Sequence, residues 1–177
     1  MHRILLLDDE KNVISALSRL LRKNRDWEVA AFTDPQEALH NAKSTRFDLF
    51  FSDYRMPIMD GVKFLQETKK LQPDAIRIIL SGFAELEGLM GAINQAEIYR
   101  FLVKPWDDLD VTMTIEQALQ ARDYLAENRC LADQVRVQKG ELDRHKHALE
   151  QLEQQHLGLT KVNWAEDGSI ILDDREL

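Results

Sequence analysis

The sequence has little of what disulfide scaffolds, zinc modules and membrane spans require. Its 177 residues include a single cysteine, Cys130, which excludes a disulfide framework and a four-cysteine zinc site. The longest stretch without a charged side chain is residues 88–96, whereas a transmembrane helix needs about 20 apolar residues. The apolar start at residues 4–7 ends at Asp8, too early for a signal peptide. We therefore expect a cytoplasmic protein with no membrane segment.

Basic side chains are also in deficit. The chain has 23 lysines and arginines against 31 aspartates and glutamates, a net charge of −8. Binding to a nucleic-acid backbone requires a basic face. We therefore expect no nucleic-acid partner.

Proline is confined to the first part of the chain, where all four prolines lie at or before Pro105. The sequence that follows has few glycines and the apolar periodicity of a long helix. We therefore expect a compact domain over residues 1–122, a helical extension over 123–159 and a short acidic tail over 160–177. In the tail, Asp167-Gly168 between two weakly alternating runs indicates a β-hairpin.

Short apolar runs alternate with segments of helical periodicity in the compact part. The runs cover residues 3–7, 28–32, 47–52, 77–80 and 99–103, and each is followed by a helical segment, the fourth over residues 86–93. Asp34-Pro35 and Asp107 are typical helix starts. Five apolar strands alternating with helices predict an α/β fold with a parallel sheet covered on both faces.

Polar side chains stand where four of these five strands end. They are Asp8 and Asp9 after the first strand, Asp53 after the third, Ser81 after the fourth and Lys104 after the fifth. Ligands of such sheets bind beyond the carboxyl ends of the strands. Taken singly, each of these residues reads as a turn or a cap; their joint occurrence at successive strand ends favours a site.

The chemistry of this set is restrictive. Three neighbouring carboxylates repel one another unless a cation is present, and Mg²⁺ accepts few carboxylates while leaving room for phosphate oxygens. A carboxylate can itself accept a phosphoryl group. A lysine and a hydroxyl would then stabilise the phosphoryl oxygens.

These residues lie in motifs that resemble the receiver domain of bacterial two-component response regulators. The motifs are Leu5-Leu6-Leu7-Asp8-Asp9, Ser52-Asp53-Tyr54-Arg55-Met56-Pro57-Ile58-Met59-Asp60-Gly61, Leu80-Ser81-Gly82 and Phe101-Leu102-Val103-Lys104-Pro105. The resemblance covers about residues 2–122 and implies a flavodoxin-like (βα)5 doubly wound parallel sheet of strand order 2-1-3-4-5. The stretch from residue 96 to Asp108 also looks like receivers that precede hydrogenase-type regulators and HD-type phosphodiesterases.

The resemblance implies a role for each site residue. Asp53 would be the phosphoacceptor, and Asp8, Asp9, Asp53 and the backbone carbonyl of Arg55 would bind Mg²⁺. Ser81 and Lys104 would bind the phosphoryl group, Ser81 and Phe101 would act as switch residues, and the bond before Pro105 would be cis. As Phe101 lacks a hydroxyl group, it could act only by rotating inward.

A heptad repeat continues from the fifth helix of the receiver. Eight of its twelve a and d positions are apolar, which is typical of a coiled coil. The a positions are Ala121, Asn128, Val135, Leu142, Leu149 and His156, and the d positions are Tyr124, Leu131, Gln138, His145, Leu152 and Leu159. Asn128 at an a position favours a parallel homodimer; a single helix folded onto its own receiver is the alternative.

The sequence therefore predicts a response regulator that takes a phosphoryl group from a histidine kinase and signals through protein contacts of its helical extension. It would catalyse only its own phosphorylation and hydrolysis and would not be an enzyme with a separate substrate. Two alternatives remain: a haloacid-dehalogenase-type phosphatase with Asp8 as nucleophile, and a receiver-fold adaptor that works without phosphorylation.

Overall fold

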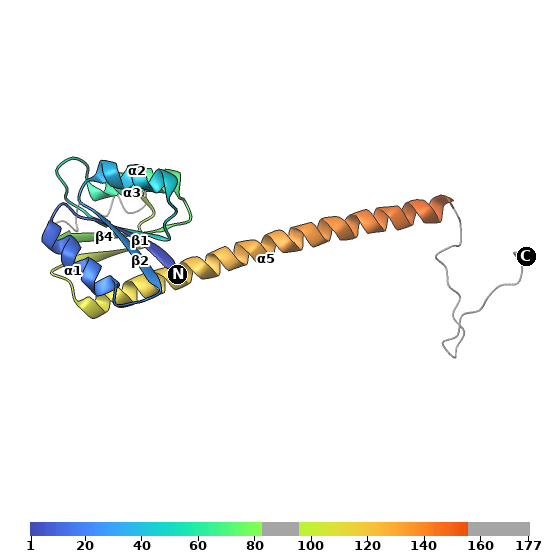
Figure 1. Ribbon diagram of the computed structural model, residues 1–177. Helices are drawn as coiled ribbons and strands as arrows, with labels where there is room; N and C mark the ends of the chain where they lie inside the picture. The colour runs from blue at the N-terminus through green and yellow to red at the C-terminus, as the bar shows by residue number, and fades with distance from the viewer. Residues whose placement is uncertain (83–95, 156–177) are drawn as a thin grey trace, which may run out of the picture. The chain divides into compact units, whose positions relative to one another are not determined.

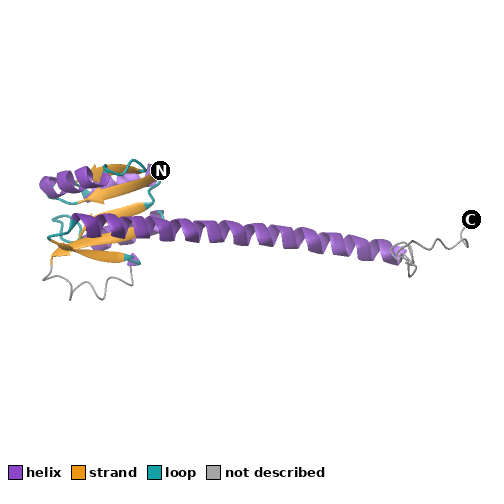
Figure 2. Cartoon of the chain, turned by 90° about the horizontal axis from the view of Figure 1, so that it is seen from below, coloured by secondary structure: helices purple, strands orange, loops and turns teal. Residues whose placement is uncertain are grey.

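The computed structural model describes residues 1–82 and 96–155, and its core is a five-stranded parallel sheet between two layers of helices (Figures 1 and 2). The strands are β1 (His2–Leu7), β2 (Trp27–Phe32), β3 (Leu49–Asp53), β4 (Ile76–Gly82) and β5 (Arg100–Lys104). The helices are α1 (Lys11–Leu21), α2 (Pro35–Ser44), α3 (Gly61–Leu71) and α5 (Asp108–Gln155). The strand order is β2-β1-β3-β4-β5, which confirms the predicted fold.

Three expectations lie outside the described residues. They are the helix over residues 86–93, the last two positions of the heptad repeat at His156 and Leu159, and the hairpin in the tail over residues 160–177.

Side chains of β1 alternate between two apolar cores. Ile4 and Leu6 of β1 are buried with residues of α1 and α5, whereas Leu5 and Leu7 are buried with residues of α2 and α3. Figure 1 shows α2 and α3 on one face of the sheet and α1 with the first part of α5 on the other. Both faces of a parallel sheet must be covered in this way, because its strands are apolar on both sides.

β3 and β4, like β5, extend past the carboxyl ends of their predicted apolar runs. β3 includes Asp53, which pairs with Leu80, and β4 includes Ser81, which pairs with Val103. The backbone ladder continues under the polar residues because the neighbouring strands are long enough to pair with them. Asp53 and Ser81 are therefore held by the sheet and not by loops, which gives a site built on them a rigid base.

Aspartates begin three of the helices, as their side chains accept hydrogen bonds from the first free backbone N–H groups. Asp34 accepts from Gln36 N at 2.8 Å and Asp60 from Lys63 N at 2.7 Å. Asp107 accepts from two N–H groups of the first turn of α5. The predicted starts at Asp34 and Asp107 are confirmed, and the Asp60 cap fixes where α3 begins beside β3.

The Gln72 side chain joins the ends of α2 and α3 at the edge of the sheet opposite the predicted site. Its Nε2 donates to the carbonyls of Ala42 and Thr45, both at 2.7 Å, and its Oε1 accepts from Phe47 N at 2.8 Å. We expect Gln72→Ala to lower the free energy of unfolding by about 2–4 kcal/mol, because each lost bond contributes about 1 kcal/mol and leaves a backbone group without its partner. Urea denaturation measures this; Gln120→Ala, at an exposed position of α5, is the control, and equal effects would contradict the assignment.

The helix α5 belongs to both parts of the chain. Val111, Ile115, Ala118 and Leu119 are buried in the core with α1, whereas every described side chain after Arg122 is exposed. The chain divides into two units, Met1–Ala126 and Glu127–Leu177. The expected helical extension is thus continuous with the last receiver helix as far as Gln155. No helix in the described ranges is long and apolar enough to cross a membrane.

Candidate phosphoacceptor site

Lys104 connects the two buried aspartates at the carboxyl edge of the sheet. Its Nζ lies 2.6 Å from Asp53 Oδ1 and 2.9 Å from Asp8 Oδ2. The three residues come from the ends of β3, β1 and β5 and are far apart in the sequence. The topology therefore brings together the phosphoacceptor candidate, one of the acid pair and the lysine, as the strand-end argument predicts.

Burial and charge set the protonation of this cluster. Asp8 and Asp53 are only 2% and 6% exposed. Burial raises the pKa of the Asp53 carboxyl, and the negative charge of Asp8 raises it further. The hydrogen bonds from Lys104 and from the backbone N–H of Arg55 lower this pKa, but the net shift is upward. For Lys104, burial lowers the pKa, but its hydrogen bonds to Asp53 and Asp8 outweigh burial and raise it overall. Lys104 therefore stays charged and offsets part of the negative charge of the two carboxylates.

Gly61 allows the α3 backbone to pack directly on Asp53. A Cβ atom at this position would lie 2.0 Å from the backbone oxygen of Asp53, far inside van der Waals contact. Gly61 N also donates to the Tyr54 carbonyl at 2.8 Å. The Ser52 hydroxyl donates to the same Asp53 oxygen at 2.9 Å. The main chain at Asp53 is therefore fixed from two sides, and the Asp60-Gly61 motif has a structural reason.

The remaining predicted residues fall at different depths. Ser81 is fully buried, and its hydroxyl donates to the Gly82 carbonyl at 3.2 Å. Phe101 is 40% exposed and lines a surface cavity of about 490 Å³ together with Tyr99, Leu102 and Asp110. The Lys104–Pro105 peptide bond is cis, as the resemblance implies. Asp9 and Arg55 are exposed.

The donor set suits Mg²⁺ but is not a ready cluster of three carboxylates. In residues 1–82 and 96–155, no group of three or more His, Cys, Asp or Glu side chains is placed to hold a metal ion. The expected convergence of Asp8, Asp9 and Asp53 therefore differs from the structure, because Lys104 lies between Asp8 and Asp53 and Asp9 is exposed. Mg²⁺ binds few carboxylates and completes its shell with carbonyl and water oxygens, so Asp8, Asp9, Asp53 and the Arg55 carbonyl are sufficient donors for it.

Two residues of this region were missed by the sequence analysis. The Glu10 backbone N–H donates to Asp8 Oδ1 at 2.8 Å, and its side chain lies 4.0 Å from Lys104 Nζ. Ser52 supports the Asp53 carbonyl. Glu10 directly follows the acid pair and Ser52 directly precedes Asp53, so their places next to predicted site residues could have identified both.

Comparison with known proteins assigns the fold to a family. The response regulator receiver domain matches residues 4–116. The chain belongs to the response regulator receiver family. This match decides against the haloacid-dehalogenase alternative, since the motif around Asp53 and Gly61 has a place only in the receiver domain.

Relatives of the receiver domain include transcriptional regulators. The hydrogenase transcriptional regulatory protein HoxA of Bradyrhizobium diazoefficiens is 35% identical over 66% of this chain, and the regulatory protein AtoC of Escherichia coli is 30% identical over 74%. The chain spans 24% and 28% of these two proteins, so it corresponds to about a quarter of their length.

A solved receiver is similarly close. The signal receiver domain of an HD domain-containing protein from Pseudomonas fluorescens Pf-5 is 33% identical, with a TM-score of 0.67; the match covers 71% of this chain and 92% of that one. HoxA and this receiver agree with the resemblance to hydrogenase-type and HD-type receivers noted in the sequence.

Proposed function

We propose that the chain is a response regulator whose Asp53 accepts a phosphoryl group from a histidine kinase in a Mg²⁺-dependent step. The observation that carries this proposal is the Lys104 ammonium in contact with both Asp53 and Asp8 at the carboxyl edge of the sheet. A buried, rigid carboxylate with an adjacent cation is suited to attack an electrophilic phosphorus atom. No separate substrate is proposed.

In the proposed step, an oxygen of the Asp53 carboxylate forms a bond to phosphorus while the bond from phosphorus to the histidine nitrogen of the kinase breaks. The leaving imidazole takes up a proton from water. Lys104, already within hydrogen-bond distance of Asp53, neutralises negative charge on the phosphoryl oxygens. The Ser52 hydrogen bond and the packing of Gly61 fix the main chain at Asp53 and so hold the attacking carboxylate in place.

Mg²⁺ would be held by Asp8, Asp9, Asp53 and the backbone carbonyl of Arg55. When bound, it supplies positive charge that offsets repulsion between the carboxylates and the incoming phosphoryl group. Asp8 is oriented for this role by the Glu10 N–H bond to its Oδ1.

Ser81 and Phe101 are the proposed switch. The Ser81 hydroxyl, which donates to the Gly82 carbonyl in the structure, would turn to the phosphoryl group. The cavity beside Phe101 gives its ring somewhere to move. A local change at β4 and β5 would then alter the surface that partners bind.

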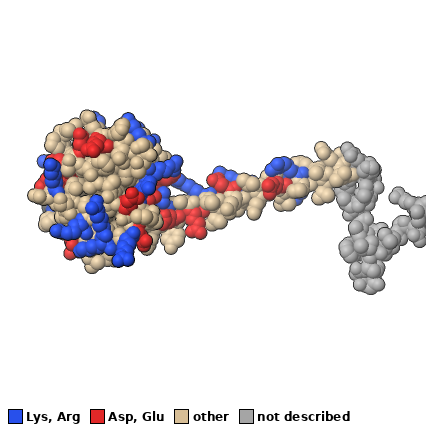
Figure 3. Space-filling model, viewed as in Figure 1, with Lys and Arg blue, Asp and Glu red and all other residues tan. Residues whose placement is uncertain are grey.

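The helical extension is proposed to form a parallel homodimer, through which the signal leaves the receiver. Five apolar side chains of the a and d positions are between 51% and 61% exposed in the single chain. They are Leu131, Val135, Leu142, Leu149 and Leu152. Burying one leucine contributes about 1.5–3 kcal/mol, which favours a second copy as the partner. Figure 3 shows uncharged surface continuing along this helix between separate charged groups.

Charge and polarity favour the parallel orientation. In a parallel coil, a g position faces the e position of the partner's next heptad. Glu141 at g therefore meets Lys146 at e, with opposite charges, and the pair occurs twice by symmetry. Asn128 at an a position would pair with its own symmetry mate.

Incubation with acetyl phosphate tests the phosphoacceptor proposal. We expect intact-mass spectrometry to show one added phosphoryl group with Mg²⁺ present and none with excess chelator. A chain that stays unmodified under both conditions, while folded, would support the phosphorylation-independent adaptor.

Lys104→Met is expected to slow phosphorylation by about 100-fold or more, because loss of one positioned charge-stabilising group typically costs that much. Asp53 would also lose the contact that keeps its pKa from rising further, so less of it would be ionised. The rate of phosphoryl incorporation measures this. Lys11→Met, at an exposed position on α1, is the matched control, and equal rates in the two variants would rule out the assigned role.

A further inference from the structure

The middle of the helical extension combines several weak features within eight residues. Gly140 lies in the interior of α5, where glycine costs about 1 kcal/mol relative to alanine. Gln138 and His145 occupy consecutive d positions on either side of it. Only Leu142 supplies an apolar layer between them.

Packing does not explain the glycine. A Cβ atom at position 140 would meet nothing within 4 Å. In the heptad frame Gly140 is at an f position, which points away from the partner strand in a dimer. An alanine would therefore fit both in the single chain and in the proposed dimer, and would favour the helix.

The Gly140 carbonyl also has a side-chain hydrogen-bond donor within reach. The Arg144 side chain donates from Nε to the Gly140 carbonyl at 3.2 Å. That oxygen is the one to which Arg144 N–H would bond in a regular helix. If the backbone bond opens, this carbonyl keeps a hydrogen-bond donor, which lowers the cost of local opening.

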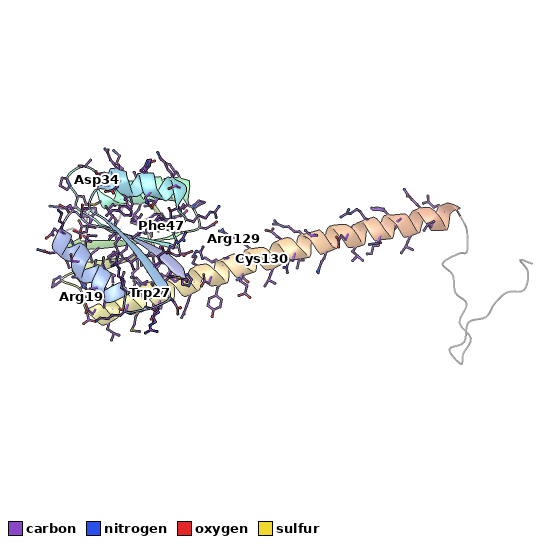
Figure 4. The ribbon with its side chains drawn as sticks, in the orientation of Figure 1. Arg19, Trp27, Asp34, Phe47, Arg129 and Cys130 are labelled. Atoms are coloured by element: carbon purple, nitrogen blue, oxygen red, sulfur yellow. The ribbon has the colours of Figure 1, made fainter. Side chains whose placement is uncertain are left out.

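Stronger apolar blocks flank this segment. Leu131 and Val135 precede it, and Leu149 and Leu152 follow it. Figure 4 shows side chains of α5 beyond Cys130 projecting on both sides of the helix. The seam thus consists of two apolar blocks joined by a polar, glycine-containing stretch.

We propose that residues 138–145 form a break in the coiled coil, at which the two strands separate first. The block at Leu149 and Leu152 can then open and close while the block at Leu131 and Val135 stays paired. This inference rests on the proposed dimer and adds the position at which its two helices separate first. A segment of low local stability between stable blocks is the kind of element that a conformational switch can use.

Hydrogen exchange of the full-length chain, read by mass spectrometry, tests the break. We expect amides of residues 138–145 to exchange about tenfold or more faster than those of both flanking blocks. Gly140→Ala should slow this exchange by about tenfold or more, because both strands gain about 1 kcal/mol of helix stability and 1.4 kcal/mol corresponds to a factor of ten.

A transposed variant is the matched control. Asp133→Gly combined with Gly140→Ala moves the glycine by one heptad to another f position, and fast exchange should move with it. Rates that rise steadily toward the end of the helix, or that ignore the position of the glycine, would overturn the break. Light scattering on the same sample separates the two proposals: a monomer overturns both, whereas a dimer with even protection overturns the break alone.

Discussion

Asp53→Asn is expected to abolish phosphorylation by acetyl phosphate and by a histidine kinase. An amide is a poor nucleophile and a poor ligand for Mg²⁺. Among the described residues, Asp8 and Asp53 are the two carboxylates that are both buried and in direct contact with Lys104. Incorporation of the phosphoryl group, followed by intact-mass spectrometry, measures the effect. Asp26→Asn, at an exposed turn, should behave as the unmodified chain.

The same variant should remain folded and be more stable. Burial raises the pKa of Asp53 above its usual value, so the folded state prefers the neutral form. The contribution of Asp53 to the free energy of unfolding is greatest below its usual pKa and falls as pH rises from the usual to the raised pKa. At neutral pH the ionised carboxylate therefore destabilises the folded state, and a neutral amide at position 53 removes this destabilisation. A higher melting temperature with no phosphorylation would separate loss of chemistry from loss of structure. Continued modification of a folded Asp53→Asn protein would contradict the role of Asp53.

Cutting the chain after Ala126 is expected to convert a dimer into a folded monomer. The compact unit ends at that residue, and it keeps the Arg122–Asp48 ion pair of 2.8 Å. The truncated chain would lose all five exposed leucine and valine positions of the seam. Light scattering at micromolar concentration gives the mass; a full-length monomer, or a truncated chain that is still fully dimeric, would rule out the coil as the interface.

Two valines of the helix provide a matched pair of substitutions. Val135 at an a position and Val137 at a c position are 61% and 60% exposed in the single chain. Val135→Lys would place a charge in the seam and should dissociate the dimer, whereas Val137→Lys would lie outside the seam and should leave it intact. Equal behaviour of the two variants would show that the heptad assignment is wrong.

The sheet and most of its site could be predicted because the relevant signals are local in the sequence. Apolar runs mark the strands, and polar residues at their ends identify the carboxyl edge. The strand order came from the resemblance to receivers, since alternation alone predicts a parallel sheet without fixing its order.

Contacts between distant residues were harder to predict. The sequence placed Lys104 near the aspartates but could not show that its ammonium lies between Asp8 and Asp53, because this depends on the depth of each side chain. It did not single out Ser52, whose hydroxyl donates to the carbonyl of its neighbour Asp53, and it gave no reason to single out Gln72, whose three hydrogen bonds join segments far apart in the chain. The role of Gln72 follows from tertiary geometry and has no sequence pattern of its own.

Peptide mapping of the phosphorylated chain tests the central claim most directly. The chain is treated with acetyl phosphate and Mg²⁺, digested, and its modified peptide is located by tandem mass spectrometry. The proposed site predicts a phosphoryl group on Asp53 and on no other residue. A phosphoryl group on Asp8, Asp9 or a histidine of the helix, with Asp53 unmodified, would contradict it.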